Sequence, residues 1–209
     1  RKNGFTSRRA AADAGLERRA GRIYGAGVCC GEKRRAVDRQ QGGSYCLKVV
    51  DTGIAGLKVI EPDVHFDDRG YFFEPYNLRR FAEAGIKEVF VQDNESRSGK
   101  GVVRGLHWQT GAAAQAKLVR VSRGAALDFA VDIRAGSPTF GRHFTIELSA
   151  ENKKQLFIPR GFAHGFMVLE DDTVFSYKCD NFYCSKSERG MRFDDPQLAI
   201  ELPDIGVPL

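Results

Sequence analysis

The most regular hydrophobic pattern in the chain is a two-residue alternation in its second half. Apolar residues occupy every second position over 127–133 and again over 144–148, and Asp128, Asp132 and Glu147 stand between them. Because successive side chains of a strand point to opposite faces, this pattern predicts half-buried antiparallel strands with their charged residues turned to solvent.

The rest of the chain after residue 46 also reads as strands separated by turns. Short apolar runs at 47–50 and 57–62 predict two strands, and Asp67-Asp68-Arg69-Gly70 predicts a turn before another extended segment. A further strand is expected at 89–93, followed by a loop with the sequence S-R-S-G-K-G. Many short strands with recurring turn signals predict a mainly β protein, and specifically an antiparallel jelly-roll barrel.

One segment has helical spacing. Residues 77–84 place Leu78, Phe81 and Ala82 on one side of a helix, with Asn77 as N-cap and Gly85 after the end. The sequence therefore predicts one short helix beside the barrel.

The first 46 residues differ in composition from the remainder. They hold eleven Lys or Arg against four Asp or Glu and show no sustained apolar period, whereas the remaining 163 residues hold 21 against 23. We interpret 1–46 as a disordered or non-native extension, from a translation artefact or fragment boundary rather than a transit peptide, and 47–209 as the folded domain. The body is mildly acidic, so no nucleic-acid partner is expected.

The cysteines indicate a reducing compartment. The chain has five cysteines without a C-x-x-C spacing, which suits neither a disulfide framework nor a zinc site. No apolar run is long enough to span a membrane, and the N-terminus lacks the pattern of a secretory signal. We predict a cytoplasmic protein with no membrane association.

Candidate chemistry gathers in two segments, 101–117 and 158–166, each with one histidine. The cationic neighbours Arg104 and Lys117 are expected to keep His107 neutral, near its reference pKa of about 6.5, as a usable general base. For Arg104 and His107 to share a face, the strand needs a kink at Gly105. The blander alternatives are a structural His107 and a turn residue His164 that bonds to backbone.

A metal site is not expected. Metal-binding cupins have a second histidine two residues after the first and a glutamate beyond it, but this chain has Gln109 and then no acid at 112–114. No metal or other cofactor is therefore assigned.

Three further side chains have both a functional and a structural interpretation. Tyr177 shares a strand face with Phe175, so its hydroxyl projects into the barrel or the residue is simply part of the core. Tyr183 is suited to stack on a planar ring, or is an ordinary surface aromatic. Arg69 follows two aspartates, so its structural interpretation is an ion pair within the turn, and its functional interpretation is a candidate site residue.

From about Leu47 to Pro203 the sequence resembles the dTDP-4-dehydrorhamnose 3,5-epimerases. The resemblance rests on the runs D-D-R-G-Y-F-F-E, V-Q-D-N, S-R-S-x-K-G-V-V-R-G-L-H-W-Q, K-L-V-R-V, D-x-A-V-D-I-R-x-x-S-P-T-F-G, L-S-A-E-N-K-K-Q-L-F-I-P-R-G-F-A-H-G-F and Y-K-x-x-x-F-Y. It implies a metal-independent, cupin-type jelly roll that forms a homodimer and converts dTDP-4-dehydro-6-deoxy-D-glucose to dTDP-4-dehydro-L-rhamnose.

The same resemblance implies a role for individual residues. His107 would be the base at C3 and C5, Tyr177 the acid on the opposite face, and Lys117 the cation that stabilises the enolate. Tyr183 would stack on thymine, and the other substrate-binding residues would be Arg69, Glu74, Gln92, Asp93, Asn94, Arg104, His164 and Glu188.

Two departures from the family pattern stand out. In the family a C-terminal aspartate orients the histidine base, but no aspartate here can be assigned that role, so we expect a domain truncated after D-I-G-V-P-L. Phe182 stands where the family often has a second tyrosine. The rival hypotheses are an epimerase acting at one carbon or an isomerase that moves the ketone, a non-catalytic sugar-binding jelly roll, and a metal-dependent oxygenase or isomerase.

Overall fold

The computed structural model describes residues 47–206, so the interpretation of 1–46 as an extension lies outside the described residues. The strands are β1 (Lys48–Asp51), β2 (Lys58–Glu61), β3 (His65–Asp67), β4 (Gly70–Phe72), β5 (Gln92–Ser98), β6 (Val103–Gln109), β7 (Lys117–Arg123), β8 (Ala125–Asp132), β9 (His143–Ser149), β10 (Gln155–Ile158), β11 (Phe162–Val168), β12 (Thr173–Cys179) and β13 (Glu188–Gly190). One short α-helix, α1 (Leu78–Glu83), and two 3₁₀ turns, η1 (Gly111–Ala113) and η2 (Ser185–Ser187), complete the described elements.

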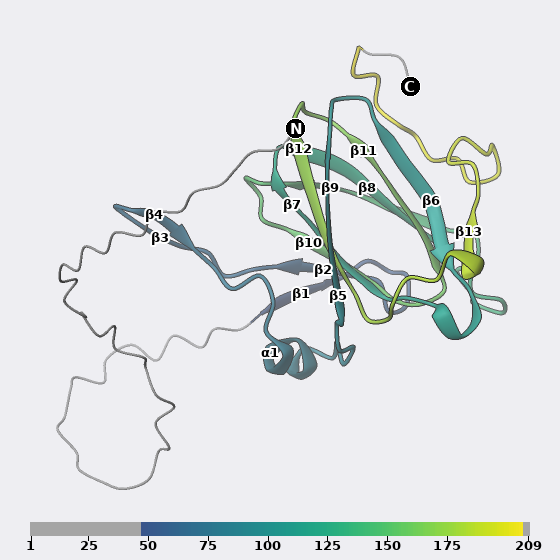
Figure 1. The fold of residues 1–209 in the computed structure, drawn as a ribbon, viewed down its shortest axis with the longest axis horizontal. Coiled ribbons are helices and arrows are strands. Elements are labelled where there is room, and N and C mark those ends of the chain that lie inside the picture. The colour runs from purple at the N-terminus through teal and green to yellow at the C-terminus, as the bar shows by residue number, and fades with distance from the viewer. Residues whose placement is uncertain (1–46, 207–209) are drawn as a thin grey trace, which may run out of the picture. The chain divides into compact units, whose positions relative to one another are not determined.

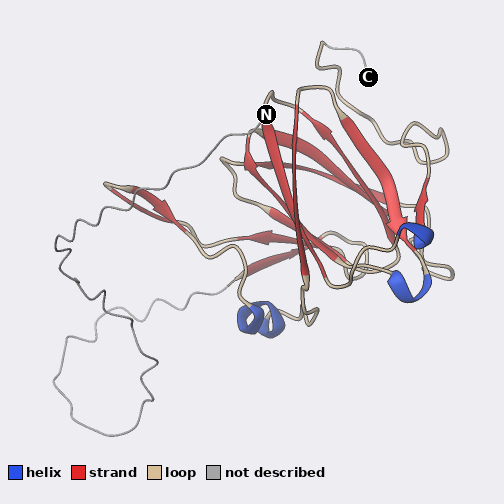
Figure 2. Cartoon of the chain, in the orientation of Figure 1, coloured by secondary structure: helices blue, strands red, loops and turns tan. Residues whose placement is uncertain are grey.

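The strands form two large antiparallel sheets and a separate hairpin (Figures 1 and 2). One sheet has the order β1-β2-β10-β7-β12-β5 and the other β13-β6-β11-β8-β9, so apart from β1–β2 and β8–β9 the neighbouring strands are not consecutive in sequence. Such long-range antiparallel pairing is typical of a jelly roll. The prediction of a mainly β jelly-roll barrel with one short helix is confirmed. Within residues 47–206, no helix is long and apolar enough to cross a membrane.

An apolar core joins the two sheets. Val121 of β7, Leu156 of β10 and Ala126 of β8 are almost fully buried, and the rings of Phe166 and Phe175 stack with centroids 3.8 Å apart. Aromatic rings of this size dominate core energetics because each removes a large apolar area from water. This core holds the sheets at a fixed distance.

Helix α1 covers the outer face of the six-stranded sheet. The Asn77 side chain accepts hydrogen bonds from the backbone N–H groups of Arg79 and Arg80, which confirms the predicted N-cap. Phe81 is buried against a cluster that includes Ile60, Leu118 and Phe157. The predicted helix face is only partly correct, because Leu78 and Ala82 are exposed.

Strand β8 departs from the prediction of a half-buried strand. Asp128 and Asp132 are fully buried, and Phe129 and Val131 on the opposite face are buried too. The reason is that apolar side chains of residues 191–205 pack on the outer face of this sheet. Strand β9 is half-buried as predicted, with Thr145 and Glu147 exposed.

Strand β5 also differs from the prediction. A strand was expected at 89–93 and a loop from residue 96, but the strand runs from Gln92 to Ser98. Its polar sequence, Q-D-N-E-S-R-S, carries no hydrophobic signal, yet every residue pairs with β12, from Gln92↔Cys179 to Ser98↔Thr173. Ladder hydrogen bonds to a neighbouring strand outweigh the weak local preference here.

The predicted kink in β6 is confirmed. His107 pairs with His164 and Arg104 pairs with Phe166, so three residue steps on β6 match two on β11. Gly105 lies in the bulge with φ of +105°, and a Cβ there would be 2.5 Å from the His164 carbonyl oxygen. Only glycine fits this close approach. The bulge turns Arg104 and His107 to the same face.

Candidate active site

A histidine and a lysine from neighbouring strands meet inside the barrel. His107 extends from β6, and Lys117 is the first residue of β7. The Lys117 Nζ atom lies 3.0 Å from His107 Nε2, and the lysine is only 6% exposed. A charged lysine donates to the Nε2 lone pair, which gives His107 the tautomer with its proton on Nδ1.

Their surroundings shift both pKa values downward. Burial, the charge of Lys117 and the proximity of His164 lower the pKa of His107 to about 3, well below the expected 6.5. Burial also lowers the pKa of Lys117 to about 8, partly opposed by anionic groups that include Asp128 and Glu188. At neutral pH the imidazole is neutral and the lysine is largely charged. The prediction of a neutral His107 agrees with this environment, and the predicted pKa value does not.

His164 is held by a buried carboxylate. Its Nε2 atom lies 2.8 Å from Asp128 Oδ2, with His164 3% exposed and Asp128 fully buried. The alternative of a His164 side chain bonded to backbone is therefore wrong. Its Nδ1 atom has no hydrogen-bond partner within residues 47–206, and its ring centroid is 6.0 Å from that of His107. An ionised Asp128 would accept from Nε2–H and leave Nδ1 as a free acceptor.

Sequence reasoning missed Asp128 because it treated the acidic positions of β8 as solvent-facing. The available signal was that apolar residues precede and follow Asp128 in sequence, as in a strand that is buried on both faces. On such a strand an acidic side chain points into the protein and needs a buried partner.

A cavity of about 220 Å³ opens beside the two histidines, and Arg104, Phe166 and Tyr177 also line it. Arg104 donates through Nε and Nη2 to Ser98 Oγ, at 3.2 and 3.1 Å. Burial, the largest cause, raises the pKa of Tyr177, so its hydroxyl stays protonated at neutral pH. Tyr177 lines the cavity and also packs against the apolar core, so both interpretations of this residue hold.

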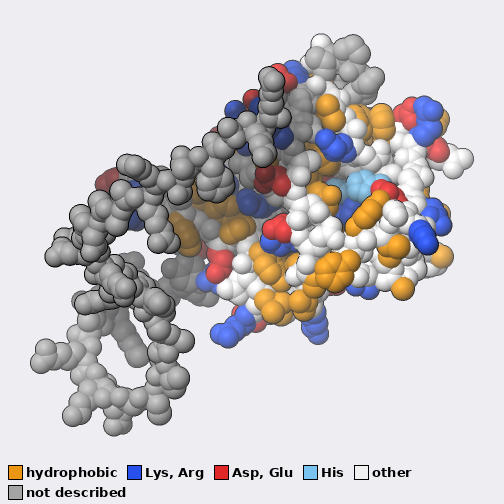
Figure 3. Space-filling model, in the orientation of Figure 1, with side chains coloured by type: hydrophobic (Ala, Val, Ile, Leu, Met, Phe, Trp, Pro, Cys, Tyr) orange, Lys and Arg blue, Asp and Glu red, His pale blue; other side chains and the backbone are white. Residues whose placement is uncertain are grey.

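A smaller adjoining cavity of about 90 Å³ extends toward the loop after β12. It is lined by Gln92 and Asn94 of β5 together with Tyr183 and Glu188. Gln92 accepts from the Tyr183 backbone N–H at 3.0 Å, and the Tyr183 hydroxyl donates to Glu188 at 2.7 Å. Figure 3 shows histidine atoms beside acidic and hydrophobic side chains on the face that it presents.

Three of the predicted site residues lie elsewhere. Arg69 is in the β3–β4 turn, where it pairs with Asp67 and its side chain is 89% exposed. Glu74 accepts from Asn77 and pairs with Arg80, both at 3.1 Å, near the start of α1.

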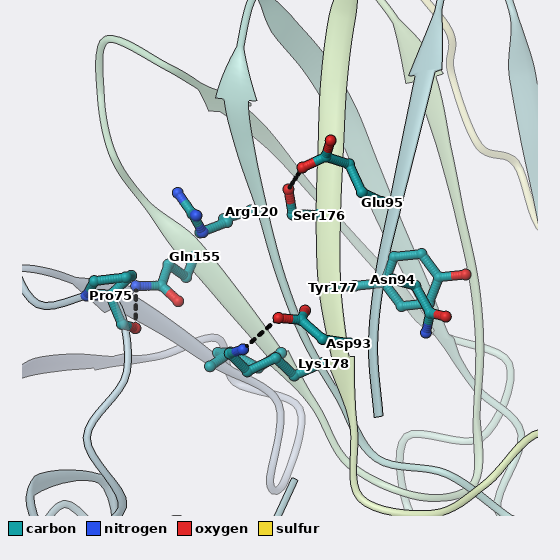
Figure 4. Close-up of a pocket in the computed structure, with 10 residues that line it drawn as sticks. Pro75, Asp93, Asn94, Glu95, Arg120, Gln155, Ser176, Tyr177 and Lys178 are labelled. Carbon is teal, nitrogen blue, oxygen red and sulfur yellow. Dashed lines mark hydrogen bonds and ion pairs between the residues drawn. The ribbon is translucent and has the colours of Figure 1, made fainter. Parts of the chain in front are cut away.

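Asp93 occupies the opposite face of β5 from Gln92 and Asn94, where it pairs with Lys178 at 2.7 Å. Figure 4 shows Asp93 directed toward Lys178, while the side chains of Tyr177 and Asn94 extend to the other side. One-residue alternation on a strand is the physical reason. Asp93 therefore does not line this cavity in the single chain, and its role in substrate binding stays a prediction.

Within residues 47–206, no group of three or more His, Cys, Asp or Glu side chains is arranged to hold a metal ion. Gln109, two residues after His107, bonds through its Nε2 to Gln115 Oε1 at 3.1 Å.

The fold and this cluster define a class: a cupin-type jelly-roll enzyme whose cavity brings together groups suited to acid–base chemistry. The family model described as dTDP-4-dehydrorhamnose 3,5-epimerase matches residues 51–208. The chain belongs to the dTDP-4-dehydrorhamnose 3,5-epimerase family.

Individual relatives agree with this assignment. The chain is 52% identical over 158 residues to the dTDP-4-dehydrorhamnose 3,5-epimerase of Shigella flexneri, covering 75% of this chain and 87% of that protein. The crystal structure of the epimerase from Elizabethkingia anophelis is 52% identical, with a TM-score of 0.73 and coverage of 77% and 89%. A Legionella pneumophila epimerase in complex with dTDP-4-keto-L-rhamnose is 51% identical, with a TM-score of 0.73 and coverage of 75% and 84%.

Proposed function

We propose that the protein epimerises C3 and C5 of dTDP-4-dehydro-6-deoxy-D-glucose to give dTDP-4-dehydro-L-rhamnose, a step in dTDP-L-rhamnose biosynthesis. The observation that carries this proposal is the 3.0 Å contact of His107 with Lys117 inside a cavity that Tyr177 also lines. The Legionella pneumophila relative, solved with dTDP-4-keto-L-rhamnose, supports the same substrate class.

In the proposed reaction His107 is the general base. Both reacting carbons flank the C4 ketone, so removal of either proton sends the electron pair to the ketone oxygen. The imidazole takes the proton and becomes a cation beside Lys117, which would be unfavourable alone. The negative enolate oxygen is attracted to both positive charges, so the pair stabilises the state in which charge has moved to oxygen.

Tyr177 is the proposed acid. Its raised pKa keeps the phenol protonated at neutral pH, so it can deliver a proton to the carbon from the face opposite His107. Removal on one face and return on the other inverts the carbon; the tyrosinate then regains a proton from solvent, and the His107 imidazolium releases its proton to solvent. The sequence of steps needs no cofactor and no metal ion.

The remaining site residues are proposed to bind the nucleotide sugar. Arg104 and His164 would contact the sugar and diphosphate, since a guanidinium fork matches phosphate oxygens. Gln92, Asn94 and Glu188 line the smaller cavity, where Tyr183 would stack on the thymine. We also propose a cytoplasmic location, on the sequence argument from the odd number of cysteines.

A homodimer is part of the proposal, because Arg69 and Glu74 line neither of the two cavities beside His107. The β3–β4 hairpin pairs with neither large sheet and exposes Phe66, Tyr71 and Phe72 by 76%, 54% and 72% (Figure 1). Exposed aromatics in one place mark an interaction surface. We propose that the hairpin docks on a second copy, and that Arg69 of the hairpin and Glu74, which follows it, contribute to the neighbour's site.

The decisive experiment is solvent deuterium incorporation at C3 and C5 of dTDP-4-dehydro-6-deoxyglucose in heavy water. We expect label at both carbons with the wild-type protein and at neither with His107→Ala. Label at one carbon would indicate a mono-epimerase, a reaction named for a Streptomyces bikiniensis structure that is 35% identical, with a TM-score of 0.70 and coverage of 75% and 79%. No label with bound substrate would indicate a sugar-binding protein.

A further inference from the structure

The loop that follows β12 carries Tyr183 and leads into Glu188, yet few of its backbone groups pair within the sheets. Residues 181–188 contain the 3₁₀ turn η2 and join the five-stranded sheet only where Glu188 pairs with Gln109. Side chains must therefore satisfy and fix the backbone of this segment.

Two glutamines, Gln109 and Gln115, support the loop through a continuous chain of hydrogen bonds. Gln115 Nε2 donates to the Asn181 carbonyl at 2.7 Å, and Gln109 Nε2 donates to Gln115 Oε1 at 3.1 Å. Gln109 Oε1 in turn accepts from the Cys184 backbone N–H at 2.8 Å. Gln109 is only 8% exposed. The chain of amides thus starts and ends on the same loop, on either side of Tyr183.

The direction of this chain is fixed by its ends. The Asn181 carbonyl can only accept and the Cys184 N–H can only donate, so each amide must donate toward residue 181 and accept from the side of residue 184. An acceptor-only carboxylate of the same shape at position 109 still accepts from Cys184 but faces Gln115 Oε1 without a proton. The arrangement therefore requires an amide, and not merely a polar side chain, at both positions.

We propose that Gln109 and Gln115 are positioning residues for nucleotide recognition: their directional amide relay holds the 181–188 loop so that Tyr183 is placed for the base. This inference rests on the proposed function, since it assumes that a thymidine nucleotide occupies the cavity beside Tyr183. Both glutamines also line the cavity of about 90 Å³, but their amide groups bond to each other and to the loop, so we expect loss of the relay to weaken binding more than the chemical step.

The test compares Gln109→Glu, Gln109→Met and Gln115→Glu in the full chain, with Gln197→Glu as the control for an added charge at an exposed glutamine. We expect the Kd for dTDP and the KM for the sugar nucleotide to rise about tenfold in the first three, with kcat within about twofold of wild type. Alkylation of Cys184 by iodoacetamide, followed on its own peptide by mass spectrometry, should become faster in these variants, and dTDP should protect it less.

Several outcomes would overturn the inference. One is unchanged dTDP affinity and Cys184 reactivity in Gln109→Glu. Another is a loss of affinity in Gln109→Glu but not in Gln109→Met, because that result would indicate charge repulsion instead of loss of the relay. Equal losses in kcat and KM would place Gln109 in catalysis. If Gln109→Glu does not fold, the less buried Gln115→Glu decides. Failure of wild type itself to bind dTDP would instead reject the proposed function.

Discussion

The proposed functional residues of the barrel interior are buried and held by close contacts, whereas that of the β3–β4 hairpin is exposed. In the barrel, His107, Lys117 and His164 are held by contacts of about 3 Å within one chain. On the hairpin, Arg69 is 89% exposed and its partner is the neighbouring Asp67. The groups proposed for proton transfer are preorganised by the fold of one chain. Arg69, by contrast, is proposed to bind substrate only after its hairpin docks on a second copy. Mutations in the two regions should therefore differ in kind.

The largest expected effect is that of His107→Ala. Loss of the proposed base should lower kcat by about 10²- to 10⁴-fold, because no other described group occupies its position next to Lys117. The measurement is product formation followed by NMR, together with dTDP affinity and thermal melting. A His107→Ala protein that retained more than a tenth of the wild-type rate would refute the role of the barrel pair.

Next in size is Tyr177→Phe, which removes the proposed acid and leaves the ring in place. We expect kcat for epimerisation to fall about 10²-fold or more while His107 still exchanges protons on its own face. Solvent label should then enter the substrate without inversion, and NMR of the recovered sugar nucleotide would detect it. Loss of exchange in proportion to epimerisation would show that Tyr177 does not act after proton removal.

The pH profile of kcat/KM tests the electrostatics of the same region. Lys117 must be charged, so the rate should fall about tenfold per pH unit above its pKa of about 8. His107 is neutral at every pH above about 3, so no acid limb is expected between pH 5 and 7. Tyr177 has a raised pKa and titrates later.

Lys117→Arg, which stays charged, should lose the alkaline limb. An acid limb near pH 6.5 in the wild type would show that His107 keeps an ordinary pKa.

The smallest effect is expected on the hairpin, where Arg69→Ala should raise KM about tenfold with little change in kcat. The sharper version mixes Arg69→Ala with His107→Ala subunits at low substrate concentration. If the hairpin acts in trans, a mixed dimer has one native site, and the mixture exceeds the mean of the two variants. Additive activity would place Arg69 in its own chain's site and remove the contrast between the two regions.

Local sequence was most informative where one signal was sufficient. Asn77 has an extended backbone and a short acceptor side chain, and it caps α1 as predicted. The three-residue spacing of Arg104 and His107 required a bulge, and Gly105 was the residue able to form it. In both cases the determining contacts are close in sequence or dictated by a missing Cβ.

Local sequence failed where a distant segment decided the outcome. Strand β5 has a polar sequence and exists because β12 pairs with it. The alternation pattern predicted that Asp128 faces solvent. In the structure, residues 191–205 cover one face of its sheet, and on the other face Asp128 contacts His164. Arg69 and Glu74 belong to the motif D-D-R-G-Y-F-F-E, but the motif alone does not show that they lie outside the cavities beside His107 in their own chain.

By itself the sequence determined the jelly-roll architecture, the epimerase family and the identity of the proposed base, acid and lysine. These follow from alternation, turn chemistry and long motifs that are properties of contiguous residues. Only the tertiary structure decided the pKa of about 3 at His107, the Asp128 partner of His164, the outward Asp93 and the amide relay through Gln109. The burial and hydrogen bonding of a side chain depend on the side chains packed around it, and in this barrel those come from strands far apart in the sequence.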